Sequence, residues 1–345
     1  MSLLEEIREQ PDTLARVVER GRAAVEAAAA EIRAAEPEFI VIAARGTSDH
    51  AATYAQYVFG IRHGLATALA SPSIVSLHGA DLRVERALVV GISQSGASPD
   101  VAAVVESARR RGAVTLAITG DPGSALGRSA GRVLELHAGA ETAVAATKTY
   151  TAELTLIAML SAALNGSAAD WLALGTLGAA AATALGEERE AARIAADQAA
   201  LPRAFVLGRS YGYATAKEWA LKLKELTYLP ADPYSTADFM HGPLALVSRE
   251  DVVFAAATAG EGGVDVRLTV EKLVRDHGVR VLLLSDDAEH GASATWSLRA
   301  PAGLPEWLAP IPAIVPAQLH AYHLARARGL DPDAPRSISK VTLTR

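Results

Sequence analysis

The strongest constraint on the fold is an internal repeat, because the second half of the chain follows the order of the first at an offset of about 165 residues. Each half contains an apolar strand, a Gly/Ser turn and an Ala-rich helix, as in FIVIAARGTSDHAATYA and AFVLGRSYGYATAKEWA. RALVVGIS then matches EDVVFAAA, and ESARRRGAVTLAITGD matches EKLVRDHGVRVLLLSDD. Short strands that alternate with long amphipathic stretches are typical of βαβ units. The sequence therefore predicts an α/β fold of two tandem doubly wound parallel-sheet domains related by internal duplication.

The same alternation gives element and domain boundaries. The predicted strands span residues 39–43, 87–92, 114–119, 132–136, 204–207, 252–256, 279–285 and 294–298. We expect leading helices over residues 1–35, a first domain over 36–166, a helical connector over 167–200, a second domain over 201–333 and a tail over 334–345.

Composition and charge restrict the kind of partner. The formal net charge of -6 comes from interspersed acidic and basic residues, so no basic surface for nucleic acid or an anionic membrane is expected. The chain contains no cysteine, which excludes disulfides and a thiol nucleophile and suits a reducing compartment. The acidic start MSLLEEIREQPD lacks the order of a secretion signal, and the longest apolar stretch, residues 154–164, is about half of what spans a bilayer. These features predict a cytoplasmic protein with a small-molecule partner.

The two halves differ after their second predicted strand, where the first has SQSGAS and the second has ATAGEGG. Ser93, Ser95 and Ser98 offer hydroxyl donors, Gln94 offers an amide, and Gly96 lets the backbone come close to a ligand. A helix is predicted to begin directly afterwards, and its N-terminal dipole favours an anion. We therefore predict a phosphate cup over residues 93–98, in the first half only.

The turn that contains Thr47 and Ser48 follows the neighbouring strand and would add donors to this cup. Two other interpretations of the serine-rich turn stay open at this point. A Ser/Gly cluster can be an ordinary helix N-cap. Gly91, Ser93 and Ser95 also come near the GxSxG elbow of serine hydrolases, but Ser95 stands where the elbow needs its second glycine. No Walker A lysine and no GxGxxG occurs, which disfavours nucleotide binding.

Acid, base and lysine groups lie in the second half and the tail. AKEWALKLKELTY places Glu218, Lys222 and Glu225 on one stripe of a helix, which is either a solvated salt-bridge ladder or a ligand-facing set. His241 lies in a Gly/Pro-bounded loop, where an imidazole can exchange a proton near neutral pH. Lys340 lies in a polar tail that requires docking to be ordered.

His320 and His323 lie three residues apart on a predicted helix, a spacing that metal sites use. Because no cysteine and no carboxylate motif accompanies them, we expect no metal there and no cofactor elsewhere.

Together these segments resemble the isomerase half of glutamine:fructose-6-phosphate amidotransferase (glucosamine-6-phosphate synthase) and the sugar-isomerase (SIS) domain family at large. The likeness covers nearly the whole chain, through EIREQP, RGTSDHA, SQSGAS, AVAATKTYTAEL, ALKLKELTY, HGPLAL and PRSISKVTLTR. The resemblance implies two tandem SIS domains that act on a sugar phosphate.

The resemblance also implies a role for each matching residue. Glu225 matches the base that moves a proton between C1 and C2 of the sugar, with Glu218 and Lys222 as its polar neighbours. His241 matches the ring-opening histidine, which the family donates from the other subunit of a homodimer, and Lys340 matches the lysine that forms a Schiff base with the open ketose. The implied substrate-binding residues are Thr47, Ser48, Ser93, Gln94, Ser95 and Ser98 at the phosphate, and Arg45, Val144 and Ala146 near the sugar.

Three features depart from the family pattern. Arg45 stands where the family usually has a small residue or cysteine, and Ala146 replaces the serine of VASTK. The cysteine of a glutaminase domain is also absent, so glutamine-dependent synthesis is not expected.

Three functions remain as hypotheses. The leading one is deamination of glucosamine 6-phosphate to fructose 6-phosphate and ammonia. The second keeps the proton abstraction at C2 but expels the C3 hydroxyl, as a dehydratase or lyase acting on N-acetylglucosamine 6-phosphate. The third is a non-catalytic sugar-phosphate sensor, since fold alone does not decide function.

Overall fold

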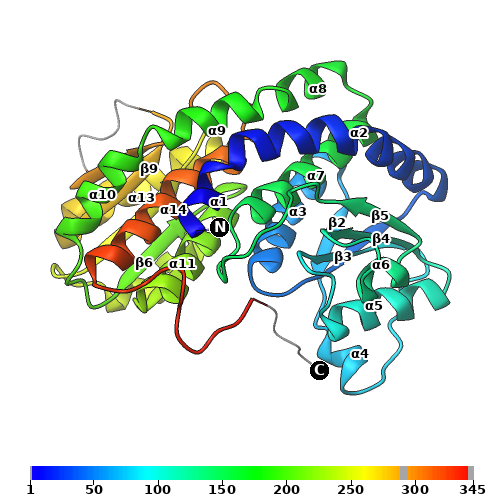
Figure 1. The fold of residues 1–345 in the computed structure, drawn as a ribbon. Helices are drawn as coiled ribbons and strands as arrows, with labels where there is room; N and C mark the ends of the chain where they lie inside the picture. Colours follow the sequence, from blue (N-terminus) through cyan, green and yellow to red (C-terminus); the bar gives the residue numbers. More distant parts are fainter. Residues whose placement is uncertain (1, 288–293, 341–345) are drawn as a thin grey trace. The chain divides into compact units, whose positions relative to one another are not determined.

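The computed structural model describes residues 2–287 and 294–340, and these form two compact units. The amino-terminal unit comprises residues 12–141 and 148–176, together with Ser339 and Lys340. The carboxy-terminal unit comprises residues 2–11, 142–147, 177–287 and 294–338. Figure 1 shows the order of the elements. Neither unit is continuous in sequence, because the first helix and the short loop of residues 142–147 both belong to the carboxy-terminal unit.

The amino-terminal unit is built on a five-stranded sheet in the order β2-β1-β3-β4-β5, with every pair parallel. The strands are β1 (Phe39–Ala43), β2 (Ala66–Leu69), β3 (Ala87–Ser93), β4 (Val114–Thr119) and β5 (Arg132–Glu135). All residues of β3 are buried, as expected for a central strand covered on both faces.

Helices cover both faces of this sheet (Figure 1). One face packs on α5 (Pro99–Arg110) and α6 (Ala125–Ser129) through the core residues Val89, Val101 and Leu126. Helices α3 (Thr47–His63) and α7 (Lys148–Asn165) pack together on the strands from the other side. The remaining helices of the unit are α4 (Ser73–Ser76), α8 (Ala168–Leu174) and most of α2 (Gln10–Ala35).

The carboxy-terminal unit repeats the plan with the order β10-β9-β8-β6-β7, again parallel throughout. Its strands are β6 (Ala204–Gly208), β7 (Ala231–Ser235), β8 (Val252–Ala257), β9 (Arg280–Ser285) and β10 (Trp296–Arg299). Helix α13 (Glu261–His277) covers one face, while α11 (Gly212–Thr227) and α14 (Pro310–Ala327) cover the other. Its other helices are α1 (Leu3–Arg8), α9 (Leu177–Leu185), α10 (Glu188–Asp197), α12 (Thr236–Met240) and the 3-10 turn η1 (Pro243–Leu246). The predicted duplication of a doubly wound parallel sheet is thus confirmed.

Every strand of the two sheets except β2 and β7 matches one of the eight predicted strands. Both are edge strands. β2 is ATAL with a half-exposed pattern, and β7 is ADPYS with a proline inside it. Short, polar or proline-containing edges avoid pairing with other chains, so they carry little of the apolar signal from which strands are predicted.

One stretch of the described chain, Ala168–Leu185, is apolar enough by composition to be a candidate membrane span. The chain divides it at Gly175 and Thr176 into α8 and α9, neither of which is long enough to cross a hydrocarbon core of about 30 Å.

Candidate active site

The predicted phosphate cup lies at the topological switch point of the amino-terminal sheet. From β1 the chain goes to β2 on one side and then to β3 on the other side of β1. The loops that leave β1 and β3 therefore diverge from neighbouring carboxyl ends, where open α/β sheets bind ligands. These loops contain residues 44–46 and 94–98.

Hydrogen bonds within the cup direct its hydroxyl oxygens toward the backbone. Ser93 Oγ accepts the Gly96 N–H at 3.1 Å, and Ser95 Oγ accepts the Ala97 N–H at 3.3 Å. Ser98 is the N-cap residue of α5, but its side chain makes no capping hydrogen bond. In this arrangement the serine O–H groups are donors that a bound anion can use, and the N-cap interpretation of the turn does not account for Ser98.

Gly96 fixes the shape of the cup. It has φ +63°, and a Cβ built on it would lie 1.9 Å from Ser124 Oγ and 2.8 Å from Thr119 Oγ1. Its carbonyl accepts the Leu126 N–H at 3.1 Å. No side chain fits at this position, so the loop can pass close to its neighbours only with glycine there.

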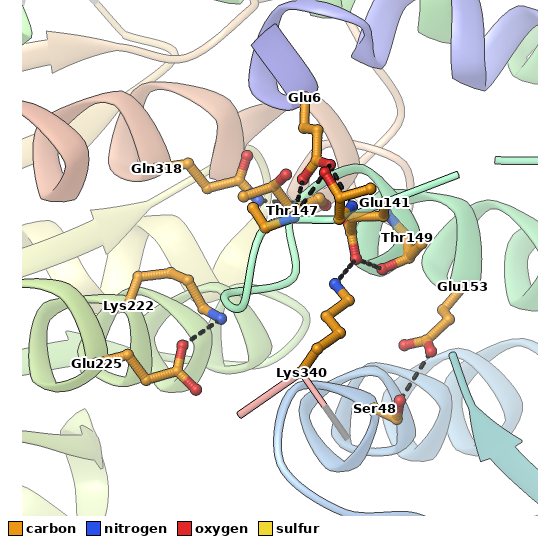
Figure 2. A network of polar contacts seen from close by, with 12 residues as sticks. Glu6, Ser48, Glu141, Thr147, Thr149, Glu153, Lys222, Glu225, Gln318 and Lys340 are labelled. Atoms are coloured by element: carbon orange, nitrogen blue, oxygen red, sulfur yellow. Dashed lines mark hydrogen bonds and ion pairs between the residues drawn. The ribbon is translucent and has the colours of Figure 1, made fainter. Parts of the chain in front are cut away.

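The second predicted loop of the cup leads into α3. Gly46 is its N-cap residue, with φ 56°, and Thr47 and Ser48 are the first two residues of the helix. The Ser48 hydroxyl donates to Glu153 Oε1 of α7 at 2.8 Å (Figure 2). In this conformation Ser48 would serve an anion through its backbone N–H.

Arg45, which precedes Gly46, forms an ion pair with Asp100 in the first turn of α5. Its Nε and Nη2 each lie 2.8 Å from Asp100 Oδ2. The Asp100 side chain is fully buried, whereas the Arg45 side chain is 47% exposed. Arg45 is predicted near the sugar from its sequence position, whereas its acidic partner Asp100 is not predicted from the sequence.

A pocket of about 390 Å³ opens beside the cup, within the amino-terminal unit. Its lining includes Gln94 and Ser95 of the cup and Glu141, which follows β5. Lys340 donates from Nζ to Glu141 Oε2 at 2.7 Å, and Thr149 donates to the same carboxylate from its N–H and its hydroxyl (Figure 2). The tail lysine is therefore docked on a buried carboxylate that lines the pocket.

The loop of residues 142–147, which carries Val144 and Ala146, is held at both ends by the carboxy-terminal unit. Glu6 of α1 is fully buried and accepts hydrogen bonds from the N–H and the hydroxyl of Thr142 and from the Ala143 N–H (Figure 2). At the other end, Gln318 of α14 donates to the Thr147 carbonyl at 3.4 Å. Val144 and Ala146, between these anchors, are partly exposed.

Helix α11 carries the predicted acid–base stripe. Lys222 Nζ lies 2.6 Å from Glu225 Oε2 (Figure 2). It also lies 3.3 Å from Glu218 Oε1. Glu218 and Lys222 are buried, and the Glu225 side chain is 23% exposed. The three residues therefore do not form the solvated ladder that was the alternative interpretation.

The pKa of Lys222 shows what this lysine can do. Burial by itself would lower the pKa of Lys222, but the carboxylates of Glu218 and Glu225 more than offset burial and raise the pKa above its ordinary value. Lys222 thus stays an ammonium ion that orients Glu225, and it is unsuited to act as an amine nucleophile. Glu225 is the member of the stripe that a substrate can reach.

His241 lies at the C-cap of α12 and is exposed, and no polar contact in the described chain joins its imidazole to the α11 stripe. The candidate metal pair has another role. His320 is fully buried, accepts the Trp219 Nε1–H on Nδ1 at 3.3 Å and lies 2.8 Å through Nε2 from Gln198 Oε1. His320 is therefore a core residue, and the described residues contain no group of side chains suited to hold a metal ion.

Four carboxylates at these sites were not predicted as site residues from the sequence. They are Glu6, Asp100, Glu141 and Glu153. Each has a partner that lies 55 to 199 residues away along the chain, so no local pattern predicts these contacts.

Comparisons with known proteins identify the family to which this chain belongs. The family model of the SIS domain matches residues 35–163 and 199–327. The glutamine–fructose-6-phosphate aminotransferase (isomerizing) of Thermococcus kodakarensis is 35% identical over 98% of this chain, and that of Shouchella clausii is 32% identical over 98%. The chain spans 57% of the length of each of these relatives.

Solved structures show the same relation. A candidate phosphosugar isomerase from Silicibacter pomeroyi superimposes with a TM-score of 0.86 at 32% identity, covering 96% of this chain and 100% of that one. The C-terminal domain of glucosamine-fructose-6-phosphate aminotransferase from Francisella tularensis gives 0.86 at 28% identity, covering 96% and 97%. A glucosamine-6-phosphate deaminase from Thermotoga maritima shares the fold, with a TM-score of 0.77 at 23% identity and full coverage of both chains.

Proposed function

Since this chain belongs to the SIS domain family and is homologous to the isomerising part of the aminotransferases, we propose that it converts glucosamine 6-phosphate and water to fructose 6-phosphate and ammonia. The observation that carries the proposal is Glu225, a partly exposed carboxylate oriented by a buried ammonium ion. Enolisation of a sugar needs such a positioned base. The serine cup supplies the affinity for the 6-phosphate.

The chemistry requires proton transfer and one molecule of water. After ring opening, Glu225 removes the proton from C2 and a proton is returned to C1, so the C2 amine becomes a C2 imine. Water adds to the imine carbon and ammonia leaves, giving the C2 ketone of fructose 6-phosphate. Lys340 is the proposed Schiff-base partner of that ketone, and its docking on Glu141 beside the cup supports this role.

The chain has no cysteine, so a thiol nucleophile for glutamine hydrolysis is absent from this sequence. With free ammonia as the nitrogen species, the same C1–C2 chemistry leads to deamination.

The test incubates the purified protein separately with glucosamine 6-phosphate and N-acetylglucosamine 6-phosphate, and follows ammonia, ketose phosphate and unsaturated product. Ammonia and fructose 6-phosphate from the free amine are expected, with deuterium at C1 when the solvent is D2O. An unsaturated product from the acetylated sugar alone would overturn deamination in favour of C3 elimination. Binding of both sugars without any product would favour the sensor.

We further propose that the enzyme is a homodimer in which His241 serves the active site of the other subunit. His241 is exposed at the end of α12 and, among the described residues, makes no polar contact with the α11 stripe, which supports this arrangement. Mixed dimers of Glu225→Gln and His241→Ala each contain one intact site if the histidine acts across the interface, so a mixture should recover about a quarter of the activity. If the mixture stays inactive, His241 acts within its own chain.

A further inference from the structure

The ion pair between Arg45 and Asp100 has no part in the mechanism proposed above, yet it lies at the entrance of the phosphate cup. Asp100 is the second residue of α5, whose N-terminus closes the cup, and its Oδ1 accepts the Val101 N–H at 2.9 Å. Its side chain is fully buried. A buried carboxylate is costly unless an opposite charge and hydrogen bonds compensate it.

The position of this carboxylate conflicts with the function of the cup. The segment SQSGAS contains no lysine and no arginine, so a phosphate would be held by hydroxyl groups, backbone N–H groups and the dipole of α5. A sugar phosphate carries nearly two negative charges at neutral pH. An uncompensated Asp100 in the same helical turn would repel it and would also cancel the favourable helix dipole.

Arg45 provides the compensating charge. Both Nε and Nη2 are directed to one oxygen of Asp100, and the Arg45 side chain is still about half exposed. Arg45 immediately precedes Gly46, so the ion pair links the two loops of the switch point, one after β1 and one before α5.

The carboxy-terminal unit offers a natural comparison. There Arg209 follows β6 and lies 3.9 Å from Asp265 of α13, and the Asp265 side chain is 52% exposed. An arginine and an aspartate occur in related places, but the pair is loose and solvated. Of these two related places, the tight pair with a buried aspartate is the one in the unit that contains the cup.

We propose that Arg45 is a positioning residue of the phosphate cup, which neutralises Asp100 at the N-terminus of α5 so that the serine cup can accept a phosphate dianion. The inference rests on the proposed sugar-phosphate site. The alternative is that Arg45 binds the phosphate directly. The two hypotheses differ because neutralisation requires Arg45 only while Asp100 carries a charge.

The test is a double-mutant cycle with Arg45→Ala, Asp100→Asn and the double variant. Isothermal titration with fructose 6-phosphate and with inorganic phosphate gives Kd for each protein. Arg45→Ala should raise Kd about tenfold or more, Asp100→Asn should leave it unchanged or lower it, and the double variant should return to within about threefold of the original protein. Arg209→Ala is the matched control and should leave Kd unchanged.

A double variant that binds as weakly as Arg45→Ala would overturn neutralisation and make Arg45 a direct phosphate ligand. An unchanged Kd in Arg45→Ala would overturn the proposal as well. If Arg45→Ala fails to fold, the double variant decides alone, because it contains no unpaired buried charge. The titrations do not depend on turnover, so a protein that follows the expected cycle but releases no ammonia would contradict the proposed function and leave this inference standing.

Discussion

The two halves of the chain have the same strand order but differ in the loop after their third strand. In the amino-terminal unit, the loop between β3 and α5 forms the serine cup around Gly96. In the carboxy-terminal unit, the loop between β8 and α13 contains Gly260, which has φ +88°. A Cβ on Gly260 would lie 2.0 Å from Cδ of Glu306, so this loop packs against a carboxylate of its own unit.

Glu306 occupies the place at α13 that an external anion would take at α5. The Gly262 N–H hydrogen-bonds to its carboxylate, and burial raises the pKa of Glu306 despite that bond. The N-terminus of α13 is thus satisfied from within the protein. The two copies therefore share a scaffold, but the α13 N-terminus is occupied by Glu306, whereas the α5 N-terminus is the proposed anion site.

The helices that follow the first strand of each unit also differ, and here it is the carboxy-terminal unit that carries the candidate functional groups. Helix α3 begins with the polar turn of the cup, and α11 carries the buried Lys222 between Glu218 and Glu225. Under the proposed function, this difference is a division of labour, in which one copy would bind the phosphate and the other would provide the proton-transfer group. Each variant below tests one side of this division.

The largest effect is expected for Glu225→Gln. The amide keeps the shape of the side chain but cannot accept a proton, so kcat should fall about a thousandfold, within the usual range for loss of a general base. KM and the thermal stabilisation by fructose 6-phosphate should stay close to those of the original protein, because the cup is in the other unit. Steady-state kinetics and thermal shifts measure both, with the exposed Glu271→Gln of α13 as control. Full turnover by Glu225→Gln would show that Glu225 is not the proton-transfer group.

Gly96→Ala tests the binding half. The added Cβ meets Ser124 and Thr119 and also forces alanine to a positive φ, so we expect a loss of about 3 kcal/mol in unfolding free energy and no measurable phosphate binding. Gly64→Ala is the control, since its φ is +67° but no atom lies within 4 Å, and it should cost only about 1 kcal/mol. Urea titrations and calorimetry provide the two measurements. Equal effects of the two substitutions would mean that the close approach at Gly96 does not shape the cup.

The structure also shows which parts of this division could be predicted from sequence. The inner strands can be predicted from their β-branched runs, and the cup can be predicted from the serine-rich turn that follows one of these strands. The edge strands β2 and β7 have no such run, and the partners of the site are single carboxylates that only the fold brings close. Asp100 is the clearest case, because as an acid in a helix first turn it is expected as an ordinary capping residue, and only its burial against Arg45 shows otherwise.

Acid should destabilise the carboxy-terminal unit through His320. Burial, with a smaller effect from His323, lowers the pKa of His320 to about 3, so the folded state keeps it neutral where the unfolded chain takes up a proton near pH 6.5. Stability is therefore full above pH 6.5 and is lost as the pH falls toward 3, by about 2 kcal/mol at pH 5. Urea unfolding between pH 7.5 and 5 should show this slope, and His320→Gln should remove most of it.

The exposed His78 of the amino-terminal unit provides the control, because His78→Gln should leave the slope unchanged. Burial also lowers the pKa of the half-buried His63 and His323, which should leave a residual slope in the His320 variant. If His320→Gln retains the whole slope, acid sensitivity does not arise at the contact of α11 with α14.

The smallest effect is expected for Glu306→Gln. This variant tests whether the carboxylate of Glu306 alone prevents the carboxy-terminal unit from binding a phosphate. The amide can still accept the Gly262 N–H, so the unfolding free energy should change by less than about 1 kcal/mol. Titration with fructose 6-phosphate should still give one site per chain, because the loop after β8 lacks the serines of the cup. A second phosphate bound by this variant, and not by the original protein, would show that one carboxylate alone keeps the second copy from binding.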